Sequence, residues 1–355
     1  MKLSAKKYIL IYGITLSIAL IFVLGLTVWI DPYFHYHKPV EGFTYSLDNQ
    51  RYQNYGILKN FEYNSMITGT SMTENFKPSE LDTLLEVNSV KTSFSGGYYK
   101  ELDQAIKYAI EKNDDLKLVI RALDTDVLIR YKDILAYETS DYPWYLYDNN
   151  IFNDTSYVFN KETLITKTIP IYTTKGTTSI TSFDMYSNWM SSYKFGKDVT
   201  LELYSRATTK ADKQVNLTDG QIVLLKDNIQ QNVIETISDN PDIEFYYFIP
   251  PYSIIWWDIV NNNGTLNSEL EAHKILIEEL LPYKNCKLFS FNTQFDIITN
   301  LDNYKDAAHY HADINSYILE QMAKGENLLT YDNYENYLKK LNEFYTNYDY
   351  DSIFV

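Results

Sequence analysis

Residues 65–81 have the sequence "SMITGTSMTENFKPSEL", and this stretch decides the fold class. A short apolar run ends at Gly69-Thr70-Ser71, and the segment that follows, residues 73–85, has the apolar spacing of a helix. In a parallel sheet, the residue just past a strand's carboxyl end lies at the crevice where ligands bind, beside the start of the next helix. The stretch therefore predicts a strand–turn–helix unit with Ser71 at such a crevice.

The same alternation continues along the chain. Strand-length apolar segments occur at 63–68, 89–94, 116–123, 243–249 and 287–291. Helical periods lie between or after them, at 73–85, 98–112, 219–237, 266–281 and 313–323. Strands that alternate with helices are typical of βαβ units, so we expect an α/β fold with a mainly parallel sheet.

The N-terminal part of the chain differs from the rest. Residues 8–30, "YILIYGITLSIALIFVLGLTVWI", contain no charge and are long enough to cross a bilayer as a helix. Three lysines lie within residues 1–7, so the positive-inside rule puts this end in the cytoplasm and the chain after Asp31 outside. A cleaved signal peptide is the alternative, but the run exceeds a usual apolar core and no A-x-A-like site follows it. We expect a single-pass anchor in the cell membrane and an extracellular domain.

The remaining chain is expected to have three parts. Residues 31–62 form a juxtamembrane segment, 63–325 the α/β domain, and 326–355 a C-terminal helical tail. Within the domain, residues 124–215 offer no strand that clearly belongs to the main sheet. We expect them to be an insertion over the carboxyl edge, where open α/β folds bind their ligands.

Composition excludes several classes of protein. The 355 residues include 47 acidic and 31 basic side chains, a formal net charge of −16, which disfavours nucleic acid as a partner. The single cysteine, Cys286, cannot form an internal disulfide, so an exported domain would depend on its hydrophobic core. Two H-x-H pairs, His35/His37 and His309/His311, could present imidazoles to a metal, but no Cys or acidic cluster completes a site. We expect no metal and no cofactor.

A serine becomes a nucleophile only when a base takes its proton, so a histidine held by a carboxylate should accompany Ser71. Among the five histidines, His309 lies in "KDAAHYHADIN" with Asp306 three residues before it. This segment follows the last strand candidate and precedes the last helix of the alternating region, so it should open at the same edge of the sheet. The alternatives are a turn or N-cap serine and a capping aspartate beside a surface histidine.

Two motifs carry a resemblance to a known family. "TGTSMTENF" (68–76) and "DAAHYH" (306–311), in this order at the two ends of an α/β domain, resemble the SGNH/GDSL hydrolase superfamily. The similarity is closest to membrane-anchored members typical of Gram-positive bacteria that resemble D-alanyl-lipoteichoic acid and alginate acetylation proteins. "RYQNYGI" and "FIPPYS" are also similar to that subgroup, and the resemblance covers about residues 49–324.

The resemblance implies a flavodoxin-like three-layer α/β/α domain and acyl-ester chemistry without a cofactor. In that chemistry Ser71 is the nucleophile, His309 the base, and Asp306 the group that orients His309. The oxyanion hole would use the backbone amides of Ser71 and of Gly96 or Gly97 in "SFSGGYY".

The third family block departs from this pattern. Where an asparagine is expected after the third strand, the chain has "RALDTDVL", residues 121–128. Asp124 and Asp126 would bring negative charge near a developing oxyanion unless they face away. Asn149 or Asn188 from the insertion could replace the missing donor.

Substrate contacts are expected from the aromatic and turn residues near the same edge. Tyr252 and Ser253 follow the fourth strand, and Trp144 could stack on a sugar ring, although packing within the insertion is the alternative. The resemblance implies an O-acyl transferase or esterase, expected to act on acetyl groups of an extracellular glycan beside a multi-pass membrane O-acyltransferase. The alternative is a non-catalytic module of the same fold that binds a polysaccharide or scaffolds a membrane complex.

Overall fold

The computed structural model describes residues 4–174 and 181–355 and divides the chain into two compact units. The first unit consists of Met1–Phe61 and Ser140–Ser182, and the second of Glu62–Thr139 and Phe183–Val355. These units divide the chain differently from the segments expected from the sequence. The middle of the expected insertion belongs with the N-terminal segment, while its two ends belong with the α/β unit.

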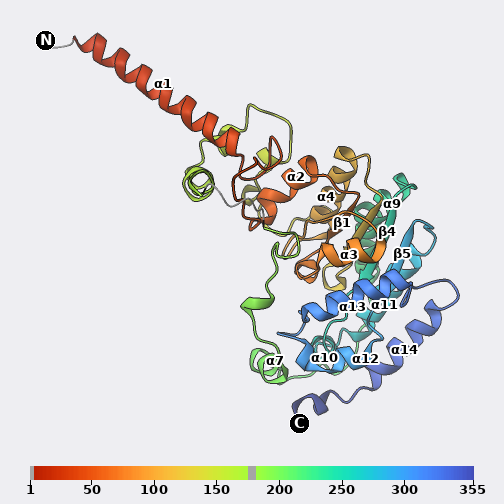
Figure 1. The fold of residues 1–355 in the computed structure, drawn as a ribbon. Helices are drawn as coiled ribbons and strands as arrows, with labels where there is room; N and C mark the ends of the chain where they lie inside the picture. The colour runs from red at the N-terminus through yellow and green to blue at the C-terminus, as the bar shows by residue number, and fades with distance from the viewer. Residues whose placement is uncertain (1–3, 175–180) are drawn as a thin grey trace. The chain divides into compact units, whose positions relative to one another are not determined.

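The second unit is built on a five-stranded sheet whose strands are all parallel (Figure 1). The strands are β1 (Ser65–Thr68), β2 (Ser89–Lys91), β3 (Leu118–Ala122), β4 (Glu244–Ile249) and β5 (Cys286–Ser290). The predicted α/β class with a parallel sheet is therefore confirmed. The spatial order β2-β1-β3-β4-β5 is that of flavodoxin-like doubly wound sheets, whose ligands bind at the carboxyl ends of the strands.

One face of the sheet is covered by α3 (Pro78–Leu85) and α13 (Ala312–Lys324), which contact each other. Buried strand residues such as Ile67, Ile120 and Phe248 form one hydrophobic cluster with side chains from both helices. Burial of such apolar surface is the main stabilising contribution to this layer.

The opposite face is covered by α4 (Tyr99–Lys112), by α11 (Leu266–Leu280), and by a continuous helical segment of three parts, α8, η7 and α9. Its parts are α8 (Asp219–Ile229), η7 (Gln230–Ile234) and α9 (Glu235–Asp239). Arg121 of β3 points to this side: its guanidinium lies over the Tyr99 ring at 4.8 Å and donates to the Asn232 carbonyl at 2.8 Å. The helices therefore contact this face partly through polar groups.

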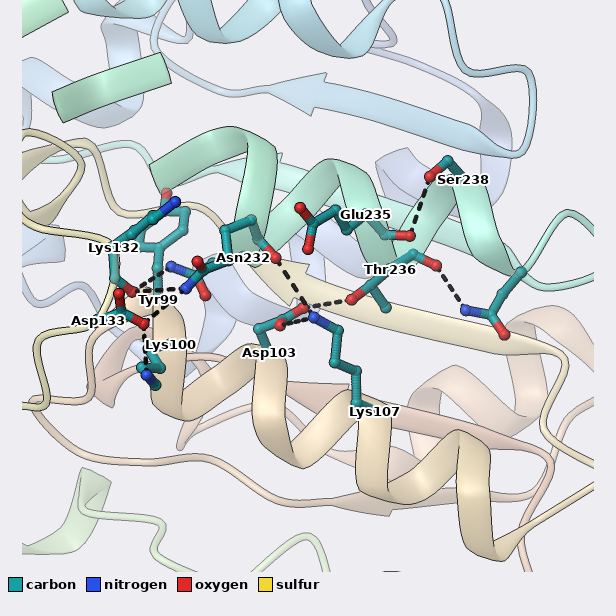
Figure 2. A network of polar contacts seen from close by, with 12 residues as sticks. Tyr99, Lys100, Asp103, Lys107, Lys132, Asp133, Asn232, Glu235, Thr236 and Ser238 are labelled. Carbon is teal, nitrogen blue, oxygen red and sulfur yellow. Dashed lines mark hydrogen bonds and ion pairs between the residues drawn. The ribbon is translucent and has the colours of Figure 1, made fainter. Parts of the chain in front are cut away.

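A second polar contact links α4 to α9. Figure 2 shows Asp103 facing Thr236, whose hydroxyl donates to the carboxylate at 2.5 Å, while Lys107 pairs with the same carboxylate at 2.8 Å. Both Asp103 and Thr236 are buried. A buried carboxylate needs such partners, because leaving it without them would cost several kcal/mol, of the order of 3–5 kcal/mol.

The other elements of this unit lie outside the sheet. α14 (Tyr334–Asn347) packs on α11, and the Tyr345 ring stacks on Trp257 with centroids 3.6 Å apart. The remaining elements of this unit are η1 (Ser71–Thr73), η2 (Thr125–Val127), η6 (Met190–Ser192), α7 (Lys197–Leu203), α10 (Ile254–Asn262), α12 (Phe295–Thr299), η8 (Leu301–Asn303) and η9 (Tyr350–Phe354), while η3 (Thr139–Asp141) spans the sequence boundary between the units.

The first unit contains the apolar N-terminal helix α1, Ala5–Ile30. Within the described residues it alone is long and apolar enough to cross a membrane, so the expected N-terminal apolar helix is confirmed. The unit also contains α2 (Gln50–Asn60), η4 (Trp144–Leu146), α5 (Thr155–Val158), η5 (Thr163–Thr168) and α6 (Ile169–Thr173).

Asp31 anchors the chain where it leaves α1. It has a left-handed backbone (φ 47°), and its buried carboxylate accepts the Tyr157 hydroxyl at 2.6 Å and the backbone N–H groups of His35 at 3.0 Å and Tyr36 at 2.7 Å. Burial raises the pKa of Asp31, and these hydrogen bonds partly offset the increase. The end of α1 is thereby fixed to the body of its own unit.

Candidate active site

The serine lies where the chain turns out of β1. Gly69 has φ +150°, and a Cβ atom there would lie 2.6 Å from Thr73 Cγ2 and 3.1 Å from Ala122 Cβ. Both the backbone conformation and the space require glycine. Ser71 then begins η1, directly beyond the carboxyl end of the strand.

The histidine lies in a closed loop after β5. The Asp306 carboxylate accepts the backbone N–H groups of Ala308 at 2.9 Å and His309 at 2.8 Å, which forms a tight turn. A bridge between Tyr304 and Tyr310 closes the base of the loop. These contacts fix the imidazole on the turn that also carries its carboxylate.

The structure brings the three side chains together. Ser71 Oγ lies 2.8 Å from His309 Nε2, and His309 Nδ1 lies 2.9 Å from each carboxylate oxygen of Asp306. With Nδ1–H donated to Asp306, Nε2 is left to accept the serine proton. The arrangement can therefore carry out base-assisted nucleophilic chemistry at Ser71.

The Asp306 carboxylate is suited to stabilise a positive imidazolium. Burial alone would raise the pKa of Asp306, but the hydrogen bond and charge of His309, together with the two amide donors, lower it below its ordinary value. Asp306 is therefore ionised at neutral pH, and its negative charge faces Nδ1.

A cavity of about 420 Å³ opens beside the serine and histidine. Its wall includes Ser71, Gly96, Asp126, Tyr252 and His309, which come from the segments that follow all five strands. The cavity thus occupies the carboxyl edge of the sheet, as the position of Ser71 after β1 predicts.

The geometry distinguishes the two expected glycine donors. The amide N–H of Gly97 donates to the Phe94 carbonyl at 2.8 Å, so it is already used in a turn. Both glycines line the cavity, but Gly96 has φ +64°, a left-handed conformation that favours glycine. Gly96 is therefore the better of the two candidates to share an oxyanion hole with the Ser71 amide.

Aspartates, not an asparagine, follow β3 at this cavity. The buried Asp124 carboxylate accepts the hydroxyls of Tyr252 at 2.5 Å and Thr70 at 2.8 Å, and thereby links the turns after β1, β3 and β4. Burial raises the pKa of Asp124, and these two hydrogen bonds partly offset the effect. Asp126 lines the cavity with an exposed side chain, and partial desolvation together with the neighbouring charges of Asp124 and Glu269 raises its pKa.

Two residues expected at the substrate have side chains with other partners in the protein. Ser253 is buried at the start of α10, and its hydroxyl donates to the Ala307 carbonyl at 2.7 Å, so it supports the histidine loop from behind. Trp144 belongs to the other unit, where its ring stacks on Tyr142 at 5.1 Å and meets Tyr147 edge-on at 5.4 Å. These contacts are the packing within the insertion that was the alternative expected for Trp144.

Two residues that the sequence did not suggest lie against the serine–histidine–aspartate group. The Trp189 ring meets the His309 ring edge-on, with centroids 5.6 Å apart and an interplanar angle of 88°. Lys305 Nζ lies 3.1 Å from Asp306 Oδ2 and over the rings of Trp189 and Tyr193, at 4.7 Å and 4.1 Å. From the sequence, Lys305 could have been found because it is adjacent to Asp306. Trp189 could not, because it lies in a segment without helix or strand periodicity.

The two histidines of the H-x-H pair in this loop, His309 and His311, make different contacts. His309 faces Ser71 and Asp306, whereas His311 Nδ1 lies 3.3 Å from the Asp313 N–H and caps α13. The two imidazoles therefore take different partners within the protein.

A scan against protein-family models found no match to the chain, and a search of curated proteins also found none.

Proposed function

We propose that this chain is a membrane-anchored enzyme that transfers or hydrolyses an O-acyl group, expected to be acetyl, on an extracellular glycan. The observation that carries the proposal is the 2.8 Å contact of Ser71 Oγ with His309 Nε2, beside a cavity at the carboxyl edge of the sheet. The resemblance of the serine and histidine segments to SGNH/GDSL hydrolases supports the same chemistry.

The first half-reaction forms an acyl-serine. His309 Nε2 takes the Ser71 proton while Oγ attacks the ester carbonyl, and the oxyanion receives hydrogen bonds from the Ser71 and Gly96 amides. The C–O bond to the leaving alcohol breaks, and His309 returns the proton to that alcohol. Asp306 stabilises the imidazolium between these two proton transfers.

The second half-reaction releases the serine. A sugar hydroxyl or a water molecule gives its proton to His309 and attacks the acyl-serine, and the proton then returns to Ser71. A sugar acceptor makes the enzyme a transferase, and water makes it an esterase. By resemblance, a multi-pass membrane O-acyltransferase would supply the acyl group, which suits a domain held at the membrane by one helix.

The missing asparagine affects the expected rate. Removal of one oxyanion donor typically costs about 2.7–4 kcal/mol of transition-state stabilisation, so two amide donors predict a slower enzyme than a complete hole would give. Asp124 is tied to two hydroxyl donors, which limits its repulsion of an oxyanion.

A serine-directed fluorophosphonate tests the proposal on the full-length protein in detergent. We expect one label per chain, found on Ser71 by peptide mass spectrometry, and no label in Ser71→Ala. Ser192→Ala is the matched control, because Ser192 is exposed and lies outside the cavity, and it should label like the wild type. An unlabelled wild type that also fails to hydrolyse p-nitrophenyl acetate would contradict the proposal.

A second candidate function is a non-catalytic module that binds a polysaccharide or scaffolds a membrane complex. The presence of Asp126 at the cavity, with no asparagine from the β3 segment, favours it. Glycan binding that survives both Ser71→Ala and His309→Ala, without esterase activity, would support this candidate over the enzyme.

A further inference from the structure

The helical segment formed by η5 and α6, residues 163–173, buries Ile171 but exposes three other large apolar side chains. Its threonines Thr163 and Thr168 are buried, at 2% and 0% exposure, whereas Ile165, Ile169 and Tyr172 are 50%, 40% and 39% exposed. The spacing of the three exposed side chains, four and then three residues, places them along one side of a helix. A helix at a protein–water surface normally exposes polar side chains on such a side.

This exposed stripe, Ile165–Ile169–Tyr172, adjoins the end of α1. The Tyr172 ring meets Trp29 edge-on with centroids 6.0 Å apart, and η5 contacts α1 directly. Both rings also contact Phe43, at 6.4 Å and 5.5 Å. All of these residues belong to the first unit. Within that unit, the stripe therefore continues the exposed apolar surface of α1.

The position of Trp29 along α1 indicates what covers the stripe. A helix of 26 residues is about 39 Å long at 1.5 Å per residue, against roughly 30 Å of bilayer hydrocarbon, so its last turn reaches the interface. Trp and Tyr side chains are enriched at that depth because their rings are apolar and carry one polar group. Trp29 is the penultimate residue of α1 and is 46% exposed.

We propose that the Ile165–Ile169–Tyr172 stripe lies on the bilayer at the level where α1 leaves it, with lipid as its occupant. Apolar side chains of such a helix insert into the boundary between headgroups and acyl chains. The buried threonines then face the protein, and the isoleucines are removed from water by lipid. The inference does not depend on the proposed enzymatic function, because none of these residues belongs to the cavity at Ser71.

Depth-dependent fluorescence quenching tests the proposal on the full-length protein in phosphatidylcholine–phosphatidylglycerol vesicles. The variant Ile169→Cys carries an NBD label, and Val223→Cys, a 57% exposed apolar position on α8, is the matched control. Burial raises the pKa of Cys286 to about 12, so its thiol should label poorly, and labelled wild type measures that background. Ile165→Cys repeats the test at a second position of the stripe.

The label at position 169 should emit at shorter wavelength than the label at position 223, and lipids with a shallow doxyl group should quench it several-fold more. Equal emission and quenching at the two positions would overturn the proposal. A disulfide between two copies of the unlabelled Ile169→Cys variant at low protein density would also overturn it, since a second copy would then cover the stripe.

Discussion

The carboxylate of Asp306 decides whether His309 presents the correct nitrogen to Ser71. In Asp306→Asn the side chain keeps its size but can donate to Nδ1, which would leave the proton on Nε2 and remove the base from the serine. We expect the rate of fluorophosphonate labelling to fall by about 10²–10⁴-fold, because replacing the aspartate of a serine–histidine–aspartate triad by asparagine has an effect of this order. The rate is measured by intact-mass spectrometry over time.

Asp313→Asn is the matched control for that experiment. Asp313 is 86% exposed and belongs to the cap of α13, so its loss should leave the labelling rate within about twofold. An Asp306→Asn protein that labels as fast as the wild type would remove Asp306 from the proposed mechanism.

Lys91 should make the free energy of unfolding depend on pH. Its amine contacts the segment that follows Ser71. It is fully buried on β2, and its amine donates to the carbonyls of Glu74 at 2.5 Å and Phe76 at 2.8 Å. Burial lowers the pKa of Lys91 to about 7. Between pH 7 and about 10.4 the unfolded chain therefore binds a proton at this lysine that the folded chain does not, so stability rises with pH.

This dependence should disappear in Lys91→Met. We expect the free energy of unfolding of the wild type, relative to the variant, to increase by up to about 1.4 kcal/mol per pH unit between about pH 7 and 9.5. Urea unfolding of the wild type and of Lys91→Met, each at about pH 7 and at about pH 9.5, measures this difference in the free energy of unfolding. Lys284→Met removes an exposed lysine and should show no such increase, and a pH-independent difference for Lys91→Met would contradict the assignment.

At the scale of secondary-structure elements, the joint between α4 and α9 offers a direct test. Thr236→Val removes the hydroxyl that donates to the buried Asp103 carboxylate and leaves Lys107 as its partner (Figure 2). We expect a loss of about 1–3 kcal/mol in the free energy of unfolding, measured by chemical denaturation. Ser238→Ala on the same helix removes an exposed hydroxyl that donates to the Glu235 carbonyl and should change stability by less than about 0.5 kcal/mol. Equal effects of the two changes would mean that the buried joint adds no stability.

The elements that the sequence predicted well are those whose pattern is local. All five strand candidates overlap β1 to β5, because short apolar runs buried on both faces are distinctive. Thr218, directly before the helical period predicted at 219–237, forms a capping box with Gln221, since capping depends on residues three apart. Ser71 and His309 could be paired because each follows a strand, and strand ends meet at one edge of a parallel sheet.

The residues that were missed have no local pattern. Trp189 reaches His309 across 120 positions of sequence, from a stretch that lacks both helix and strand periodicity. For Trp144 the sequence left stacking on a sugar and packing within the insertion open, and its ring packs on Tyr142 and Tyr147. Side-chain contacts over such separations depend on the path of irregular segments, which composition alone does not determine.

At the scale of the whole molecule, two units with separate interiors should differ in stability. Multi-unit chains commonly depart from two-state unfolding, so calorimetry of the full-length protein should resolve more than one transition. Tyr157→Phe tests this in the first unit, because it removes the hydroxyl that donates to the buried Asp31 carboxylate at 2.6 Å. The expected loss is about 1–3 kcal/mol, seen as a lower midpoint of one transition only.

The label on Ser71 identifies which transition belongs to which unit. Samples taken during heating are treated with the fluorophosphonate, and the temperature at which labelling stops reports the α/β unit that carries Ser71 and His309. That temperature should be the same in Tyr157→Phe and wild type, whereas Thr236→Val should lower it. If Tyr157→Phe lowers both midpoints equally, the two units unfold as one cooperative body, and the boundaries at 61, 139 and 182 have no thermodynamic meaning.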